Sequence, residues 1–195
     1  MDYKKVLLGT LETRQLGRNE FNKAMEILDK ELKHRPRDNN FLLKKFESFP
    51  EFFIGVFLDS EVIGVICGFP REDYLLISEL AVDSRFQRRG FGRGLVKEFE
   101  RTAREKKYKK INLGAWDNAI NFYKSLDYKS HLLIQYKKEY YSYEDFKELN
   151  ITKKTEDAEY KILEVEMERK DLELLVKLRK KYPNAYFSIY FYKIT

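Results

Sequence analysis

Several residue types and patterns are scarce in this sequence, and each scarcity excludes a class of protein. A single cysteine excludes an internal disulfide framework, and the only two histidines, His34 and His131, are too far apart for the ligand spacing of a zinc site. No apolar run reaches the roughly 18 residues of a membrane-spanning helix. The first residues also lack the apolar region and cleavage site of a signal peptide. We therefore expect a cytoplasmic protein with no metal and no membrane association.

The chain also has only a small excess of positive over negative charge. The chain has 38 basic and 32 acidic residues, a net charge of +6, and lysine and glutamate are interspersed along it. Nucleic-acid binding is therefore not expected, because it would require basic residues clustered on one face. With 195 residues, of which 43% are apolar, the chain can bury one core and a small appendage. Cys67 lies in an apolar run and is predicted to be a buried small side chain rather than a catalytic thiol.

The most informative stretch runs from Ile77 to Leu95. It begins with a short apolar segment typical of a strand, continues with three closely spaced glycines, and ends in a pattern that predicts a helix from about Arg93 to Lys107. A glycine-rich turn before a helix presents backbone amides and the positive end of the helix dipole to one point, which suits a phosphate or pyrophosphate. Three arginines add positive charge there: Arg88, Arg89 and Arg93.

The segment Gln87-Arg88-Arg89-Gly90-Phe91-Gly92 resembles the acetyl-CoA signature Gln/Arg-x-x-Gly-x-Gly/Ala of the GNAT superfamily of N-acetyltransferases. The resemblance implies that acetyl-CoA is the co-substrate and that the strand before the signature pairs with the pantetheine arm through its backbone. The residues that it assigns to acetyl-CoA are Leu80, Ala81, Val82, Gln87, Arg88, Arg89, Gly90, Phe91, Gly92 and Arg93.

A second segment, from Asn118 to Tyr128, looks like the family's Asn-x-x-Ala-x-x-x-Tyr-x-x-x-Gly-Phe motif. The resemblance implies that Tyr123 is the general acid that protonates the departing thiolate, and that Asn118 and Phe122 lie beside the cofactor. The chain departs from the motif at two positions. Asn118 directly precedes the alanine, and Asp127 stands where the family usually has glycine.

Glu79 is the candidate general base, because it lies in the strand that leads into the signature. Strict alternation predicts that it shares a face of the sheet with Ile77 and Ala81. A structural carboxylate at this position, with a chain of waters acting as the base, is the alternative.

The alternation of apolar patterns predicts an α/β (α+β) fold. It is similar to the GNAT fold, a mixed and mostly antiparallel central sheet flanked by helices, over a domain of residues 1–138. Residues 139–195 are predicted to form a strand-helix-strand extension that packs on the main body or on a second subunit of a homodimer. Strands are expected at residues 3–8, 52–58, 62–69, 74–82, 110–115, 129–136, 162–167 and 185–194, and helices at 19–34, 41–49, 93–107, 117–126 and 171–182.

These features together predict an N-acetyltransferase that moves an acetyl group from acetyl-CoA to a primary amine by direct transfer in a ternary complex. The amine acceptor, a small molecule or a protein amine, matches no motif in the sequence. Two other functions remain open at this point: a regulatory module that binds acyl-CoA without catalysis, and a basic RNA-associated protein.

Overall fold

The computed structural model describes residues 9–33, 38–166 and 172–195. Its internal contacts divide the chain into two compact units, one of Met1–Ile111 with Ile194–Thr195 and one of Asn112–Lys193.

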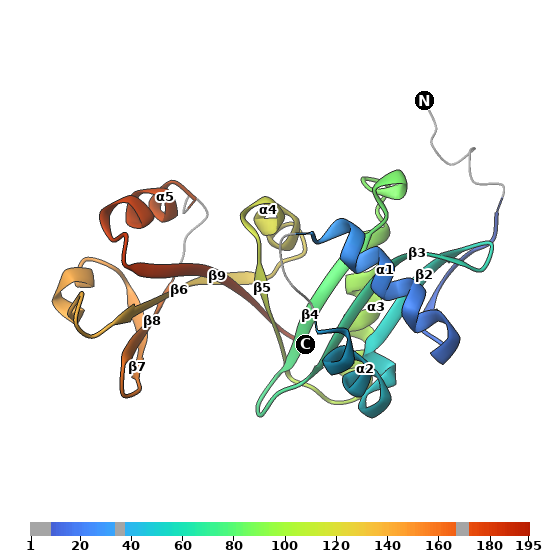
Figure 1. The fold of residues 1–195 in the computed structure, drawn as a ribbon, viewed down its shortest axis with the longest axis horizontal. Coiled ribbons are helices and arrows are strands. Elements are labelled where there is room, and N and C mark those ends of the chain that lie inside the picture. The colour runs from blue at the N-terminus through green and yellow to red at the C-terminus, as the bar shows by residue number, and fades with distance from the viewer. Residues whose placement is uncertain (1–8, 34–37, 167–171) are drawn as a thin grey trace. The chain divides into compact units, whose positions relative to one another are not determined.

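The first unit contains four antiparallel strands in the order in which they occur along the chain. Helix α1 packs on one face of β3 and β4, and α3 packs on the opposite face (Figure 1). Helix α2 joins α1 in the core on its side of the sheet. The elements are β1 (Leu11–Gln15), α1 (Phe21–Glu31), α2 (Asn39–Ser48), β2 (Phe53–Leu58), β3 (Glu61–Pro70), β4 (Leu75–Val82) and α3 (Phe91–Glu105).

Helix α3 packs closely against the sheet, and this packing fixes the position of its first turn. The helix buries Leu95, Val96, Phe99 and Ala103, each with no exposed surface. A Cβ atom on Gly68 of β3 would lie 2.6 Å from Cζ of Phe99, so only glycine lets the helix approach this closely. The spacing of apolar residues that predicted this helix is therefore confirmed as the spacing of its buried face.

A β-bulge interrupts the pairing of β3 with β4. Cys67 pairs with Glu79 and Gly68 pairs with Ile77, so Ser78 is the extra residue. Gly68 faces α3, and its partner Ile77 therefore faces α3 as well. Glu79 pairs with Cys67, which belongs to the core under α1 and α2. The prediction that Ile77 and Glu79 share a face is wrong, because strict alternation does not survive a bulge.

The second unit is a sheet with the strand order β5-β9-β6-β8-β7. Strand β6 pairs antiparallel with β8 on one side and with β9 on the other. The end of the chain is therefore a central strand of this sheet. The elements are β5 (Lys110–Ala115, in this unit from Asn112), α4 (Ile120–Lys124), β6 (Lys129–Lys137), β7 (Ile151–Glu156), β8 (Tyr160–Glu166), α5 (Leu172–Lys181) and β9 (Ala185–Ile194).

An aromatic cluster fills part of the core of the second unit. The Phe146 and Tyr182 rings lie 4.5 Å apart, and Tyr136 stacks on Phe146 at 5.0 Å. The hydroxyl of Tyr182 donates to the carbonyl oxygen of Asp145 at 2.5 Å. Burial raises the pKa of Tyr136 to about 12, so this phenol carries its proton at neutral pH.

Most of the predicted elements are confirmed, with three corrections. Helix α1 begins at Phe21 after a short 3-10 turn, Arg18–Glu20, two residues after the predicted start. Helix α3 begins at Phe91, two residues before the predicted start. Residues 151–156, for which no strand was predicted, form the edge strand β7, which pairs with β8. The predicted strand at residues 3–8 lies outside the described residues.

Candidate active site

The N-terminus of α3 lies at the predicted acetyl-CoA signature. Gly90 is the N-cap residue and has φ +90°, a left-handed conformation that favours glycine. The first hydrogen bond of the helix runs from the N–H of Gly94 to the carbonyl oxygen of Gly90 at 3.0 Å. The amides of Phe91 and Gly92 therefore precede the intrahelical ladder and point out of the helix end. Gly92 and Gly94 belong to the helix itself, so of the three glycines only Gly90 makes the turn.

Positive charge surrounds this helix end. Arg88 has φ +61°, so left-handed residues at 88 and 90 flank Arg89 in the turn before α3. The side chains of Arg88, Arg89 and Arg93 are exposed. The guanidinium of Arg89 lies 5.8 Å from the centre of the Phe86 ring. The helix dipole adds to their field.

There is room for an anionic group beside these amides. Among the described residues, a Cβ atom built on Gly90 would have no heavy atom within 4 Å apart from those of its chain neighbours. A pyrophosphate needs open space, unpaired amides and nearby cations, and the residues at this helix end supply all three. The donor set therefore fits the pyrophosphate of acetyl-CoA.

The strand segment that was predicted to bind the pantetheine arm ends directly before this turn. Leu80 lies on the α3 face of β4, and Ala81 lies on the α1 face, in the core cluster. The carbonyl oxygen of Val82 accepts a hydrogen bond from Nε2 of Gln87 at 2.8 Å. The side chain of Gln87 thus holds the end of the strand, a role that the sequence did not reveal.

Glu79, the candidate base, lies on the face of the sheet that α1 and α2 cover and is partly buried. The bulge at Ser78 sets this orientation. A carboxylate in such a place keeps limited access to solvent, which suits either a base or a structural role.

The remaining predicted residues belong to the second unit. Tyr123 is buried in α4, and its ring contacts those of Phe122, Tyr128 and Phe191 at 5.0, 5.7 and 5.6 Å. Asn118 is exposed in a 3-10 turn before α4. Asp127 has φ +62°, so it takes the left-handed conformation expected where the family usually has glycine.

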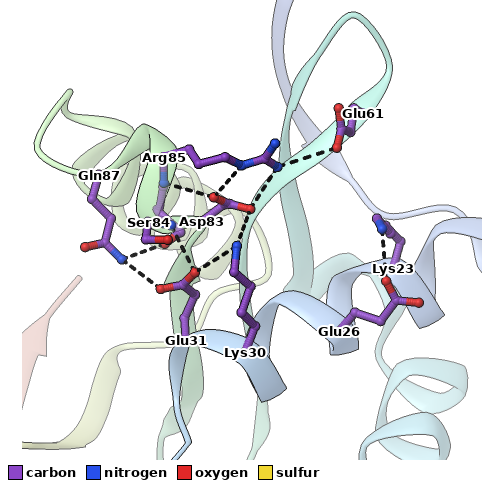
Figure 2. A network of polar contacts seen from close by, with 10 residues as sticks. Lys23, Glu26, Lys30, Glu31, Glu61, Asp83, Ser84, Arg85 and Gln87 are labelled. Atoms are coloured by element: carbon purple, nitrogen blue, oxygen red, sulfur yellow. Dashed lines mark hydrogen bonds and ion pairs between the residues drawn. The ribbon is translucent and has the colours of Figure 1, made fainter.

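A buried carboxylate, Asp83, organises the turn between β4 and α3. Its side chain is 7% exposed. Its two oxygens accept hydrogen bonds from the backbone N–H of Arg85 at 2.9 Å, from the Arg85 guanidinium at 3.0 Å, and from Nζ of Lys30 at 3.1 Å (Figure 2). The hydrogen bonds from Arg85, with that from Lys30, hold the pKa of Asp83 well below its usual range. The position after a strand marks Asp83 as a turn residue, but the sequence does not indicate its link to α1.

This lowered pKa predicts a pH-dependent loss of stability in Asp83→Asn. Because the folded-state pKa lies below the unfolded-state value, the charge of Asp83 stabilises the fold above about pH 5, and this contribution declines as the pH falls below about 4. We expect the substitution to cost about 1–3 kcal/mol at pH 7 and clearly less at pH 3. Urea unfolding at both pH values measures the difference, with the exposed Asp73→Asn as the control. An equal cost at both pH values would contradict the prediction.

Comparison with known proteins identifies the family. The sequence pattern of the Acetyltransferase (GNAT) family matches residues 17–128, more than half of the chain. The chain belongs to the GNAT family and is an N-acetyltransferase, as the signature predicted. A comparison with curated protein sequences finds no match.

Solved structures share the fold. Ard1 from Thermoplasma volcanium has a TM-score of 0.57 and 21% identity, over 81% of this chain and 99% of its own. The ribosomal-protein-S18-alanine N-acetyltransferase from Escherichia coli has a TM-score of 0.55 and 17% identity, over 83% of this chain and 98% of its own. PaiA N-acetyltransferase from Thermoplasma acidophilum, solved in complex with coenzyme A, has a TM-score of 0.52 and 15% identity, over 81% of this chain and 99% of its own. At these identities the likeness concerns the fold.

Over residues 9–33, 38–166 and 172–195, no three His, Cys, Asp or Glu side chains gather in a group that could hold a metal ion. None of the helices in these ranges combines the length and the apolar character needed to cross a bilayer.

Proposed function

We propose that this acetyltransferase transfers the acetyl group of acetyl-CoA directly to a primary amine, within a ternary complex of enzyme, acetyl-CoA and acceptor. The observation that carries the proposal is the N-terminus of α3, where two amides precede the intrahelical ladder, Gly90 is left-handed with open space beside it, and three exposed arginines lie within three residues of it along the chain. That combination suits the pyrophosphate of coenzyme A, and the GNAT pattern covers it.

This reaction requires three catalytic functions from the protein. The neutral amine attacks the thioester carbonyl, a carbon–nitrogen bond forms, and the carbon–sulfur bond breaks. A base must take a proton from the amine, a donor must stabilise the oxyanion, and an acid must protonate the departing thiolate. We assign the base role to Glu79, directly or through water, and the acid role to Tyr123.

The remaining residues of the proposed site bind and orient acetyl-CoA. Leu80, Ala81 and Val82 would offer backbone groups to the pantetheine arm, in the way that a strand pairs with an extended peptide. Arg88, Arg89 and Arg93 would neutralise phosphate charge. Asn118 and Phe122 would lie along the arm, as the family motif implies.

Direct transfer is favoured over a covalent acetyl-cysteine route. Cys67 is the one cysteine of the sequence, and its side chain is fully buried in the core beneath α1 and α2. A thiol in such surroundings is not exposed to substrate as a catalytic nucleophile must be.

A screen of amine acceptors tests the proposal. The purified full chain would be incubated with acetyl-CoA and a panel of small amines, polyamines, aminoglycosides, and peptides with a free N-terminus or lysine, while a thiol reagent detects released coenzyme A. We expect thiol release that depends on one class of amine, with mass spectrometry showing the acetylated product. Release that is equal with and without every amine, together with unmodified acceptors, would contradict the proposal.

A further inference from the structure

We propose that Glu31, the last residue of α1, is a positioning residue for acetyl-CoA, because it fixes the segment that carries the signature. The inference rests on the proposed function, since it takes the N-terminus of α3 as the binding site for the pyrophosphate. It adds a residue from a distant part of the chain that belongs to neither family motif.

Glu31 holds the turn between β4 and α3 at two places. Its Oε1 accepts the backbone N–H of Ser84 at 3.0 Å, and its Oε2 accepts Nε2 of Gln87 at 3.2 Å (Figure 2). The same amide of Gln87 also donates to the carbonyl oxygen of Val82 at 2.8 Å. A single carboxylate thus connects α1 to the start of this turn and to the first residue of the signature.

The carboxylate is well placed to act as a fixed support. Its side chain is only 12% exposed, and Nζ of Lys30 lies 3.5 Å from its Oε1. Lys30 also binds Asp83 at 3.1 Å, so one ammonium group balances both carboxylates of the network. Helix α1 itself is anchored by Ala24 and Leu28, which have no exposed surface. A support attached to a packed helix holds its partners with little freedom.

The consequence for binding follows from preorganisation. Gln87 lies three residues before Gly90, so a loose Gln87 would let the turn and its arginines sample conformations in which the amides do not converge. Fixing a binding loop in advance reduces the entropy lost on binding and thereby increases affinity. Glu31 would therefore strengthen acetyl-CoA binding without touching the cofactor.

Glutamine cannot replace Glu31 in this role. Its side chain has one carbonyl oxygen and one NH2 group, while both partners, Ser84 and Gln87, are donors. One of the two hydrogen bonds must therefore be lost in Glu31→Gln, although the size of the side chain is unchanged. Helix α1 also supplies a matched control, Glu26→Gln, because Glu26 is exposed and pairs with Lys23 alone among the residues drawn (Figure 2).

Isothermal titration of the full-length protein with acetyl-CoA tests the inference, well below the melting temperature of each variant. We expect the dissociation constant of acetyl-CoA to be about tenfold larger for Glu31→Gln and unchanged for Glu26→Gln. The effect of Glu31→Gln should also shrink in a Gln87→Ala background, because the two residues would then act through one contact.

The outcomes separate this inference from the proposed function. If the unaltered protein does not bind acetyl-CoA, the proposed function fails. If it binds and Glu31→Gln binds equally well, Glu31 is not a positioning residue. A lower melting temperature with an unchanged dissociation constant would assign Glu31 a purely structural role and would also overturn the inference.

Discussion

Gly92→Asp is expected to weaken acetyl-CoA binding strongly while the fold survives. Gly92 lies in the first turn of α3, where an added carboxylate would meet the phosphates that we place there. Two like charges about 4 Å apart repel by about 1 kcal/mol in water and about 4 kcal/mol near a protein surface, so affinity should fall by about 5- to 1,000-fold. An acidic residue in the first turn of a helix is favourable for the helix itself, which is why folding should not suffer.

Gly94→Asp is the matched control for this substitution. Gly94 lies two residues further along α3, and among the described residues a Cβ atom there would have no heavy atom within 4 Å apart from those of its chain neighbours and of the nearby helix backbone. Two residues correspond to about 200° around a helix, so the new carboxylate would point away from the position of Gly92. Calorimetry should show a much smaller loss of affinity for Gly94→Asp. An unchanged affinity in Gly92→Asp would mean that the N-terminus of α3 is not the pyrophosphate site.

Tyr123→Phe is expected to lower turnover by about 100- to 10,000-fold with little change in acetyl-CoA affinity. The substitution keeps the ring, and therefore its contacts with Phe122, Tyr128 and Phe191, but removes the hydroxyl that we propose as the proton donor to the leaving thiolate. The expected loss therefore concerns the chemical step. It can be measured once the amine screen has supplied an acceptor, as kcat together with the dissociation constant of acetyl-CoA.

Tyr128→Phe provides the control for Tyr123→Phe. Tyr128 is also buried, and its ring lies 5.7 Å from that of Tyr123. The change therefore removes a hydroxyl from a ring beside Tyr123. If the two variants lose activity equally, the effect comes from the packing of these rings. Near-normal turnover in Tyr123→Phe would show that Tyr123 serves as core packing and that the proton comes from water or another residue.

Short-range patterns in the sequence predicted most of the elements and the GNAT family. The apolar spacing of Leu95, Val96 and Phe99 depends on helix periodicity alone, and the glycine signature depends on local backbone geometry. Both are properties of adjacent residues, so no knowledge of the fold was needed. Asp127 is similar, because its left-handed conformation follows from its position at the end of a helix.

The predictions that were wrong concern features that depend on partners far away in the chain. Strand β7 is polar and exposed along its length, so it lacks the apolar alternation that marks a strand, and its pairing with β8 defines it. The bulge at Ser78 arises from the register between two strands, and it reversed the face predicted for Ile77 relative to Glu79. Alternation within one strand carries no information about such a register.

The sequence by itself determined the family, the signature and the types of most elements, because each of these depends on residues that are neighbours along the chain. The tertiary structure alone decided that the last strand lies between β5 and β6, and that Glu31 holds Gln87 from 56 positions away. Contacts of this kind form only when the packing of whole helices and strands offsets the entropy of closing a long loop. No local pattern of residues records that balance.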